Sequence, residues 1–271
     1  RPVVQVRVNG RGPYDFILDT GAGTTVIDSA LAESLGLVAV GQDSIGDPRN
    51  PRALAVQWMR ADSLQLGGLT VTGLPMANFN IRRMLGSRYG GILGLPTFAS
   101  VLVSLDYPRG EVRVTRGELA ATEPAVVAYA SSDGIVRVPL HIGSTTLAAH
   151  LDSGSPGGLL LPRSRSAGFA FKEEPTLAGR AGTVGGTSTV YRARLHGEVK
   201  LGPLHYTDPE VHLSELLADW ANIGFDILRE LIVTVDQRHH LVRLERSATG
   251  AAALPTRRRI GVLFAAQQAP A

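Results

Sequence analysis

Two short segments of this chain contain residues that could carry acid–base chemistry. Residues 19–21 read Asp-Thr-Gly and residues 152–154 read Asp-Ser-Gly, and each segment follows an apolar stretch. One such triplet means little, because an ordinary turn in which Asp caps its own backbone uses the same residue types. Two carboxyls held together, however, could share one proton, and the ionised member could activate a water molecule. That chemistry requires a fold that brings the two segments face to face.

The sequence repeats itself at a nearly constant spacing. Four landmarks of the first half return in the same order 133, 135, 130 and 130 residues later: Asp19 as Asp152, Leu66 as Leu201, Gly94 as Gly224, and Asp106 as Asp236. Residues 3–10 are also similar to residues 136–143. This order and spacing indicate a tandem duplication. Two similar halves related by a pseudo-two-fold axis would place the two strand ends, and with them the two carboxyls, together.

The local pattern is that of a β protein with tight turns. Short segments rich in Val, Leu, Ile and Thr are separated by 31 Gly and 16 Pro residues. Residues 3–18 form a predicted hairpin that ends at Asp19, and residues 64–71 form another. A short helix is expected over residues 30–35, with Gly36 as its end.

The repeat divides the chain into four parts. We expect an N-terminal lobe over residues 1–116, a linker over 117–133 and a C-terminal lobe over 134–246. Residues 247–271 have no counterpart in the first half and form an appendage. The appendage could be an extra strand that covers a sheet edge, which we favour, or a pseudo-substrate tail.

Four motifs together point to a known family. They are Asp19-Thr20-Gly21-Ala22, Asp152-Ser153-Gly154-Ser155, Ile92-Leu93-Gly94 and Asn222-Ile223-Gly224. This pattern resembles the retropepsin-like and pepsin-like aspartic proteases, over roughly residues 3–246. The resemblance implies an all-β fold of two pseudo-two-fold-related, retropepsin-like β-barrel lobes with a few short helices and an active-site cleft between the lobes.

The resemblance also implies an activity. The expected protein is a monomeric aspartic endopeptidase in which Asp19 and Asp152 activate a shared water to cut an extended peptide or protein, without a covalent intermediate. Family members bind no metal and no cofactor, so none is expected. The alternative is a catalytically weak or inactive peptide-binding module that keeps the same cleft.

The residues beside the two acids receive supporting roles from the resemblance. Thr20 and Ser153 would each hydrogen-bond to the opposite loop, and Gly21 and Gly154 would let backbone N–H groups approach the carboxyls closely. The halves differ at the next position, where the hydroxyl of Ser155 could donate to Asp152 and Ala22 could donate nothing to Asp19. Our hypothesis from this difference is that Asp152 carries the charge and Asp19 the proton.

A mobile hairpin usually covers the cleft of such proteases. The second half offers a glycine-rich candidate whose tip comprises Thr183, Val184, Gly185 and Gly186. In the first half, residues 41–51 occupy the equivalent place. The sequence leaves open which of the two segments covers the cleft.

Composition excludes several other classes of function. The net charge is +3, but 25 of the 27 basic residues are Arg and they are scattered, which indicates a solvated surface and no nucleic-acid partner. The chain has no Cys, which excludes disulfides and thiol chemistry, and no long apolar stretch that would make an integral membrane segment. From the absence of Cys and the start at Arg1 we expect a bacterial, periplasmic or secreted protein.

The remaining polar and aromatic residues favour structural roles. Asp106 and Asp236 follow strands and precede turn residues, so we expect them to cap turns. The adjacent His239 and His240 would point to opposite faces of a strand and would not bind one metal ion together. Trp58 and Trp220 are expected to pack against the lobes.

Overall fold

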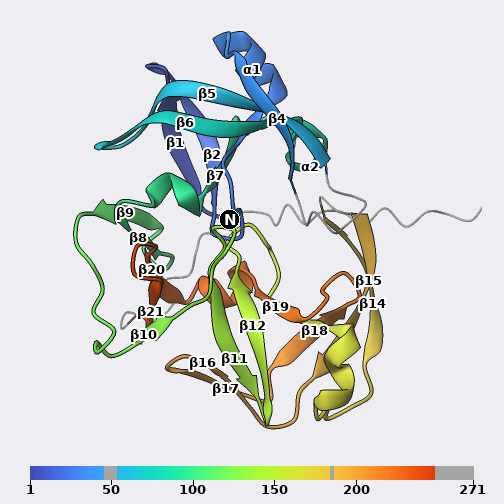
Figure 1. Ribbon diagram of the computed structural model, residues 1–271. Coiled ribbons are helices and arrows are strands. Elements are labelled where there is room, and N and C mark those ends of the chain that lie inside the picture. Colours follow the sequence, from blue (N-terminus) through green and yellow to red (C-terminus); the bar gives the residue numbers. More distant parts are fainter. Residues whose placement is uncertain (46–53, 184–185, 248–271) are drawn as a thin grey trace, which may run out of the picture.

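The computed structural model describes residues 1–45, 54–183 and 186–247 of the chain (Figure 1). These residues are mostly β-strand, with a few short helices, so the all-β prediction is confirmed. Within the described ranges, none of the helices combines the length and apolar character needed to cross a membrane.

The first half folds into one sheet that closes on itself. Its strands are β1 (Val3–Val8), β2 (Arg11–Asp19), β3 (Val26–Asp28), β4 (Ala39–Ile45), β5 (Leu54–Leu66), β6 (Leu69–Phe79) and β7 (Gly91–Gly94). The strand order is β1-β2-β7-β3-β6-β5-β4, and β1 also pairs with β5, which closes a six-stranded barrel. Its helical segments are α1 (Ser29–Leu35), α2 (Arg82–Leu85) and η1 (Leu95–Phe98).

The second half contains a larger sheet. Its strands are β11 (Arg137–Ile142), β12 (Thr145–Leu151), β13 (Leu159–Pro162), β14 (Thr176–Thr183), β15 (Gly186–Arg194), β16 (Glu198–Leu201), β17 (Leu204–Thr207), β18 (Glu210–Ser214) and β19 (Trp220–Ile223). The strand order is β14-β15-β18-β13-β19-β12-β11-β16-β17. Its helical segments are η2 (Arg163–Gly168) and α3 (Phe225–Leu228).

The two sheets have corresponding strand orders. If β11, β12, β19, β13, β18, β15 and β14 are matched to β1, β2, β7, β3, β6, β5 and β4, each set follows the same sequence of neighbours. The first half uses two long strands, β5 and β6, where the second half uses the shorter pairs β15 with β16 and β18 with β17. The corresponding strands are interrupted in the second half, but the order of neighbours around β2 and β12 is the same in both sheets.

A third sheet joins the two halves. It consists of β8 (Leu102–Asp106), β9 (Glu111–Thr115), β10 (Val126–Ala128), β20 (Leu231–Asp236) and β21 (Leu241–Arg246). Their order is β10-β21-β20-β8-β9, and the sheet lies at one side of the molecule in Figure 1. At its centre β8 runs antiparallel to β20, where Ser104 pairs with Thr234 and their hydroxyls are 2.8 Å apart. Corresponding residues of the two halves therefore face each other.

The predicted linker contains a strand. Residues 126–128 form β10, which pairs with β21 at the edge of the joining sheet. Two β-branched residues, Val126 and Val127, suit this extended position. Segment 117–133 therefore contributes to the joining sheet, a contribution that its small and polar residues did not reveal.

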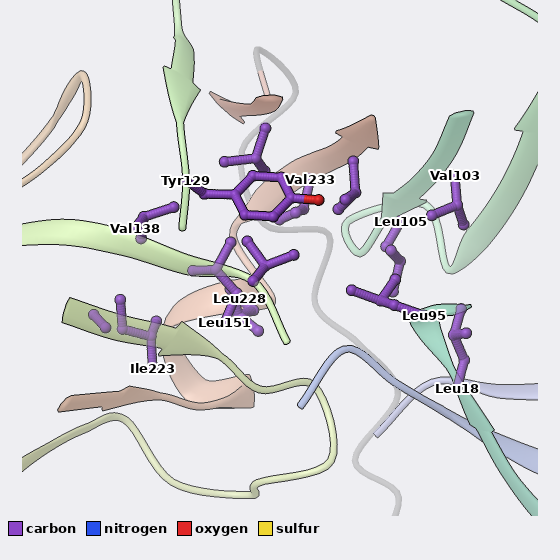
Figure 2. Close-up of a cluster of buried hydrophobic side chains, with 14 of the residues drawn as sticks. Leu18, Leu95, Val103, Leu105, Tyr129, Val138, Leu151, Ile223, Leu228 and Val233 are labelled. Atoms are coloured by element: carbon purple, nitrogen blue, oxygen red, sulfur yellow. The ribbon is translucent and has the colours of Figure 1, made fainter. Parts of the chain in front are cut away.

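One cluster of buried apolar side chains extends through both halves. Figure 2 shows Leu18, Leu95 and Leu105 from the first half near Leu151 and Val233 from the second. Each of these side chains is almost fully removed from solvent. Burying a Leu or Val side chain contributes about 1.5–3 kcal/mol. The two strand ends that carry the acidic residues thus rest on a shared core.

The local predictions for the first half agree with the structure. Residues 3–18 form the hairpin of β1 and β2, and the predicted helix is α1. Gly36 ends α1 in the left-handed conformation, with φ of 68°. Asp28 precedes α1, but its carboxylate pairs with Arg82, at 2.7 Å from Nε, and does not cap the helix.

Candidate active site

Each acidic residue lies at the end of a strand that runs parallel to a buried neighbour. β2 pairs with β7 so that Asp19 lies beside Gly94. β12 pairs with β19 in the same way, and the backbone N–H of Asp152 donates to the carbonyl of Ile223 at 2.9 Å. The backbone hydrogen bonds to β7 fix the end of β2, and those to β19 fix the end of β12. The motifs Ile92-Leu93-Gly94 and Asn222-Ile223-Gly224 therefore directly support the two acids.

Reciprocal hydrogen bonds join the two acidic loops. The hydroxyl of Thr20 donates to the carbonyl of Leu151 at 2.5 Å and accepts the N–H of Ser153 at 3.0 Å. The hydroxyl of Ser153 donates to the carbonyl of Leu18 at 2.8 Å and accepts the N–H of Thr20 at 3.0 Å. Both hydroxyl residues are buried. Each bond in one direction has a partner in the other, which is the pattern of a local two-fold axis.

Glycine is required beside each acid because the opposite carboxyl occupies the space of a side chain. A Cβ atom on Gly154 would lie 2.2 Å from Oδ2 of Asp19, and one on Gly21 would lie 2.7 Å from Cγ of Asp152. Distances this short are not tolerated between non-bonded atoms. The two loops thus approach each other through their glycines, and the carboxyls meet at the contact.

The two carboxyls form one electrostatic unit. The N–H of Gly21 donates to Oδ1 of Asp19 at 2.8 Å, and the N–H of Ser155 donates to Oδ1 of Asp152 at 2.9 Å. Each carboxyl also lies against the glycine of the opposite loop. Burial and then the neighbouring charge of Asp152 raise the pKa of Asp19 to about 7. Burial also raises the pKa of Asp152, although hydrogen bonds from Asn222 and Ser155 oppose this effect. Such a pair retains one proton over a broad pH range.

Residues 4–97 match the family model of an aspartyl protease. The matched range contains Asp19, Gly21 and Gly94, so it includes one acidic loop together with the strand that supports it. A comparison with curated proteins finds no match for the chain. The aspartyl protease match supports a protease-type function in general and lies within the first half of the chain.

Beyond the aspartyl protease match, the second acidic loop has its own local differences. We predicted that the hydroxyl of Ser155 would donate to Asp152, but the bond to Asp152 comes from the Ser155 backbone N–H. Ala22 is its counterpart in the first loop. Asn222 is a residue to which the sequence analysis gives no role; it lies on the same sheet face as Asp152, and its amide lowers the pKa of that acid. The sequence does distinguish Asn222, because it is a polar residue at the position where the first half has the apolar Ile92.

Tyr107 is a second residue that we had not predicted. Its side chain is buried and its ring packs edge-on against Phe225, with ring centres 5.8 Å apart. Among the described residues its buried hydroxyl has no hydrogen-bond partner, and burial raises its pKa above the ordinary value for Tyr. Its position directly after Asp106, a landmark of the repeat, is the feature of the sequence that could have identified it. The phenol of Tyr107 thus stays neutral.

The two hairpin candidates occupy corresponding places in the sheets. β14 and β15 form the hairpin of the second half, where Thr183 pairs with Gly186; Val184 and Gly185 lie outside the described residues. β4 and β5 form the hairpin of the first half, and residues 46–51 of that candidate are also outside the described residues. Figure 1 shows β14 and β15 on the side of the molecule away from the joining sheet.

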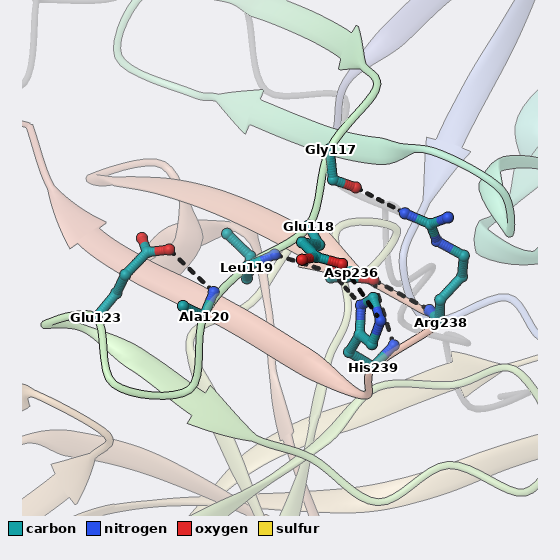
Figure 3. Close-up of polar contacts among 8 residues, drawn as sticks. All are labelled: Gly117, Glu118, Leu119, Ala120, Glu123, Asp236, Arg238 and His239. Carbon is teal, nitrogen blue, oxygen red and sulfur yellow. Dashed lines mark hydrogen bonds and ion pairs between the residues drawn. The ribbon is translucent and has the colours of Figure 1, made fainter.

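The two repeated turn acids cap turns, as predicted. Asp106 accepts the N–H of Arg109 at 3.1 Å. Asp236 accepts the backbone N–H groups of Leu119, Arg238 and His239, and Figure 3 shows this turn against segment 117–123. Both acids thus serve the fold and lie outside the group of residues at the acidic loops.

The two adjacent histidines lie in the turn that follows β20. His239 and His240 are exposed, and they are not on a strand as our argument about opposite faces had assumed. The ring of His239 contacts Asp236, with Nδ1 at 2.8 Å from Oδ2. The turn therefore directs His239 onto its own capping acid.

The two tryptophans pack, as predicted. Trp58 on β5 packs against a small buried cluster that contains Val26, Val56, Ala77 and Ile81. Trp220 on β19 stacks on His150, with ring centres 3.9 Å apart and 6° between the planes. The partner of Trp220 is thus a polar ring on the strand that carries the second acid.

Proposed function

We propose that this protein is an aspartic endopeptidase in which Asp19 and Asp152 of one chain form the catalytic pair. The observation that carries the proposal is the reciprocal set of hydrogen bonds between Thr20 and Ser153, which holds the two loops against each other. The aspartyl protease match over residues 4–97 supports the same reaction class.

The proposed reaction uses the single proton that the pair retains. The ionised carboxylate takes a proton from a bound water, and the oxygen of that water attacks the scissile carbonyl carbon. The protonated carboxyl donates to the carbonyl oxygen as it becomes tetrahedral. Collapse of the intermediate breaks the C–N bond, and the amine leaves with a proton from the pair. One hydroxyl of the intermediate returns its proton to the pair as the carbonyl re-forms, so the pair again holds one proton. No bond forms between the protein and the substrate.

The proposal includes a single-chain, two-lobed enzyme that acts as a monomer on an extended peptide or protein. Corresponding strand orders in the two larger sheets support a tandem duplication. The direct pairing of Ser104 with Thr234 supports a two-fold relation, because these residues hold equivalent places in the repeat. Since each half supplies one acid, one chain contains the complete pair.

Cleavage of a denatured protein mixture between pH 3 and 7 tests the proposal. We would compare the wild type with Asp19→Asn and Asp152→Asn, and identify the products by mass spectrometry. Each substitution should reduce cleavage by at least about a hundredfold, because either one removes the shared proton chemistry. Asp62→Asn, at an exposed position of β5, is the matched control and should cut like the wild type.

Two outcomes would contradict the proposal. Cleavage that persists in both Asp19→Asn and Asp152→Asn would mean that another site is responsible. A folded wild-type protein that cuts nothing at any pH would favour the alternative of a peptide-binding module. In that case, binding of the same peptides without turnover would identify the module.

A further inference from the structure

The two acids of the pair have unequal neighbours. On the second half, β12 and β19 run in parallel with His150 beside Asn222, so the alternation of side chains places Asn222 on the same face of the sheet as Asp152. On the first half, the corresponding strands place Ile17 beside Ile92. The backbone N–H bonds to Asp19 and Asp152 are nearly equal in length, so they do not distinguish the two acids. The side chains of Asn222 and Ile92 do.

His150, the partner of Asn222 on the neighbouring strand, takes part in a chain of polar and ring contacts. Asn222 is only 6% exposed, and its neighbour two residues earlier, Trp220, stacks on His150. The Nε2 atom of His150 accepts a hydrogen bond from Nε of Arg137 at 2.8 Å, and the guanidinium of Arg137 pairs with Asp133. Because burial and the nearby Arg137 lower the pKa of His150 to about 4, this ring stays neutral and can act as that acceptor.

We propose that Asn222 is a positioning residue that keeps the negative charge of the catalytic pair on Asp152 and the proton on Asp19. This inference rests on the proposed function. An amide N–H that donates to a carboxylate stabilises the ionised form, whereas the apolar side chain of Ile92 gives Asp19 no such donor. Asp152 then takes the proton from water, and Asp19 donates to the scissile carbonyl. The substrate must therefore bind with its carbonyl oxygen toward Asp19.

The other groups that face the pair leave this assignment unchanged. Tyr107 stays neutral because burial raises its pKa. Burial is the larger cause of the raised pKa of Asp19, and the charge of Asp152 is the second. This agrees with a protonated Asp19 beside an ionised Asp152. The reciprocal hydrogen bonds alone would leave the two acids equivalent. Asn222 on β19 and Ile92 on β7 make their surroundings unequal, so the charge favours Asp152.

The experiment follows the two carboxyl carbons by NMR. The full chain is labelled with ¹³C at the Asp carboxyls and titrated from pH 3 to 9, and Asp19→Asn and Asp152→Asn assign the two signals. In the wild type, Asp152 should dominate the lower titration step and Asp19 the upper one. In Asn222→Leu, the lower step should rise by about one pH unit, and the two carboxyls should share both steps more evenly.

Ile92→Leu is the matched control, because it changes the corresponding position without adding or removing a hydrogen-bond donor. Its titration should follow that of the wild type. If Asn222→Leu does not fold, as judged by circular dichroism, Asn222→Ala removes the amide without adding volume and should give the same shift. A pH–rate profile whose acidic limb moves by the same amount would link the titration to turnover.

The outcomes separate this inference from the proposed function. Superimposable curves for the wild type and both Asn222 variants would overturn the inference, as would an equal shift in Ile92→Leu. The titration needs no substrate. If Asn222→Leu shifts the lower step but the wild type cuts no peptide, the inference about Asn222 is supported and the proposed protease function is contradicted. If the wild type cuts peptides but the Asn222 variants titrate like the wild type, the protease function is supported and the inference about Asn222 is contradicted.

Discussion

At the scale of single residues, the site depends on glycines that leave room for the opposite carboxyl. Gly154 lies against Asp19 and Gly21 lies against Asp152, so a methyl group at either position would overlap with a carboxyl. Gly157, in the same loop as Gly154, has open space where a side chain would begin. The chain therefore contains its own matched comparison between a glycine that the site requires and one that it does not.

Gly154→Ala should separate the two loops. We expect a loss of kcat of about a hundredfold or more, and a loss of about 1–3 kcal/mol in the free energy of unfolding, because the added methyl forces backbone or carboxyl shifts. Gly157→Ala should keep both quantities close to those of the wild type. Peptide cleavage rates and urea unfolding measure the two effects. Unfolding free energies that agree within about 0.5 kcal/mol across all three proteins would contradict the close contact.

At the scale of elements, the turn after β20 fixes the segment that leads from the first half to the second. Asp236 is almost fully buried and accepts the N–H of Leu119 at 3.0 Å. Burial alone would raise its pKa, but hydrogen bonds from His239 and Leu119 outweigh this and hold the pKa below the ordinary value. Asp106, its counterpart, receives a backbone N–H from Arg109, within its own turn.

Asp236→Asn should destabilise the fold more than Asp106→Asn. We expect a loss of about 1–3 kcal/mol at pH 7, because one acceptor oxygen for buried N–H groups becomes a donor. A carboxyl whose pKa is lowered in the folded state stabilises the fold above its unfolded pKa, and this contribution disappears as pH falls through the folded pKa. The difference from the wild type should therefore shrink below about pH 4. Urea unfolding at several pH values measures it, and equal losses in both variants would contradict the special role of the turn.

At the scale of the whole molecule, the shared core and the joining sheet hold two acids together at a cost. The buried cluster includes side chains of both halves, and β8 pairs with β20 across them. These contacts keep Asp19 beside Asp152 even though the pKa of Asp19 is raised to about 7. An unfolded chain would release the Asp19 proton near pH 4, so the folded state binds the extra proton between these values.

The stability of the wild type should therefore fall, relative to Asp19→Asn, as pH rises from about 4 to 7. The unfolded state binds fewer protons than the folded state in this window, and the slope can reach about 1.4 kcal/mol per pH unit. Urea unfolding at pH 5 and 7.5 would compare the wild type, Asp19→Asn and the exposed control Asp62→Asn. An Asp19→Asn effect that is the same at both pH values would rule out a strongly raised pKa for Asp19.

Features that depend on neighbours along the chain could be predicted from the sequence. Alternating apolar residues and turn glycines identified the hairpin of β1 and β2, and Gly36 ended α1 where its left-handed backbone requires glycine. The repeated Asp19 and Asp152 were visible because a duplicated pattern preserves order and spacing. Strand β10 was not visible, since only its pairing with β21 makes that short segment extended.

The sequence by itself determined which residues recur and where the chain turns, because both depend on local backbone preferences and on order along the chain. Only the tertiary structure decided which side chains meet at the pair of acids. Asn222 lies 70 residues after Asp152 and reaches it because β19 runs parallel to β12. Electrostatic effects depend on distance in space and on burial, so the unequal surroundings of the two acids arise only when distant strands pack together.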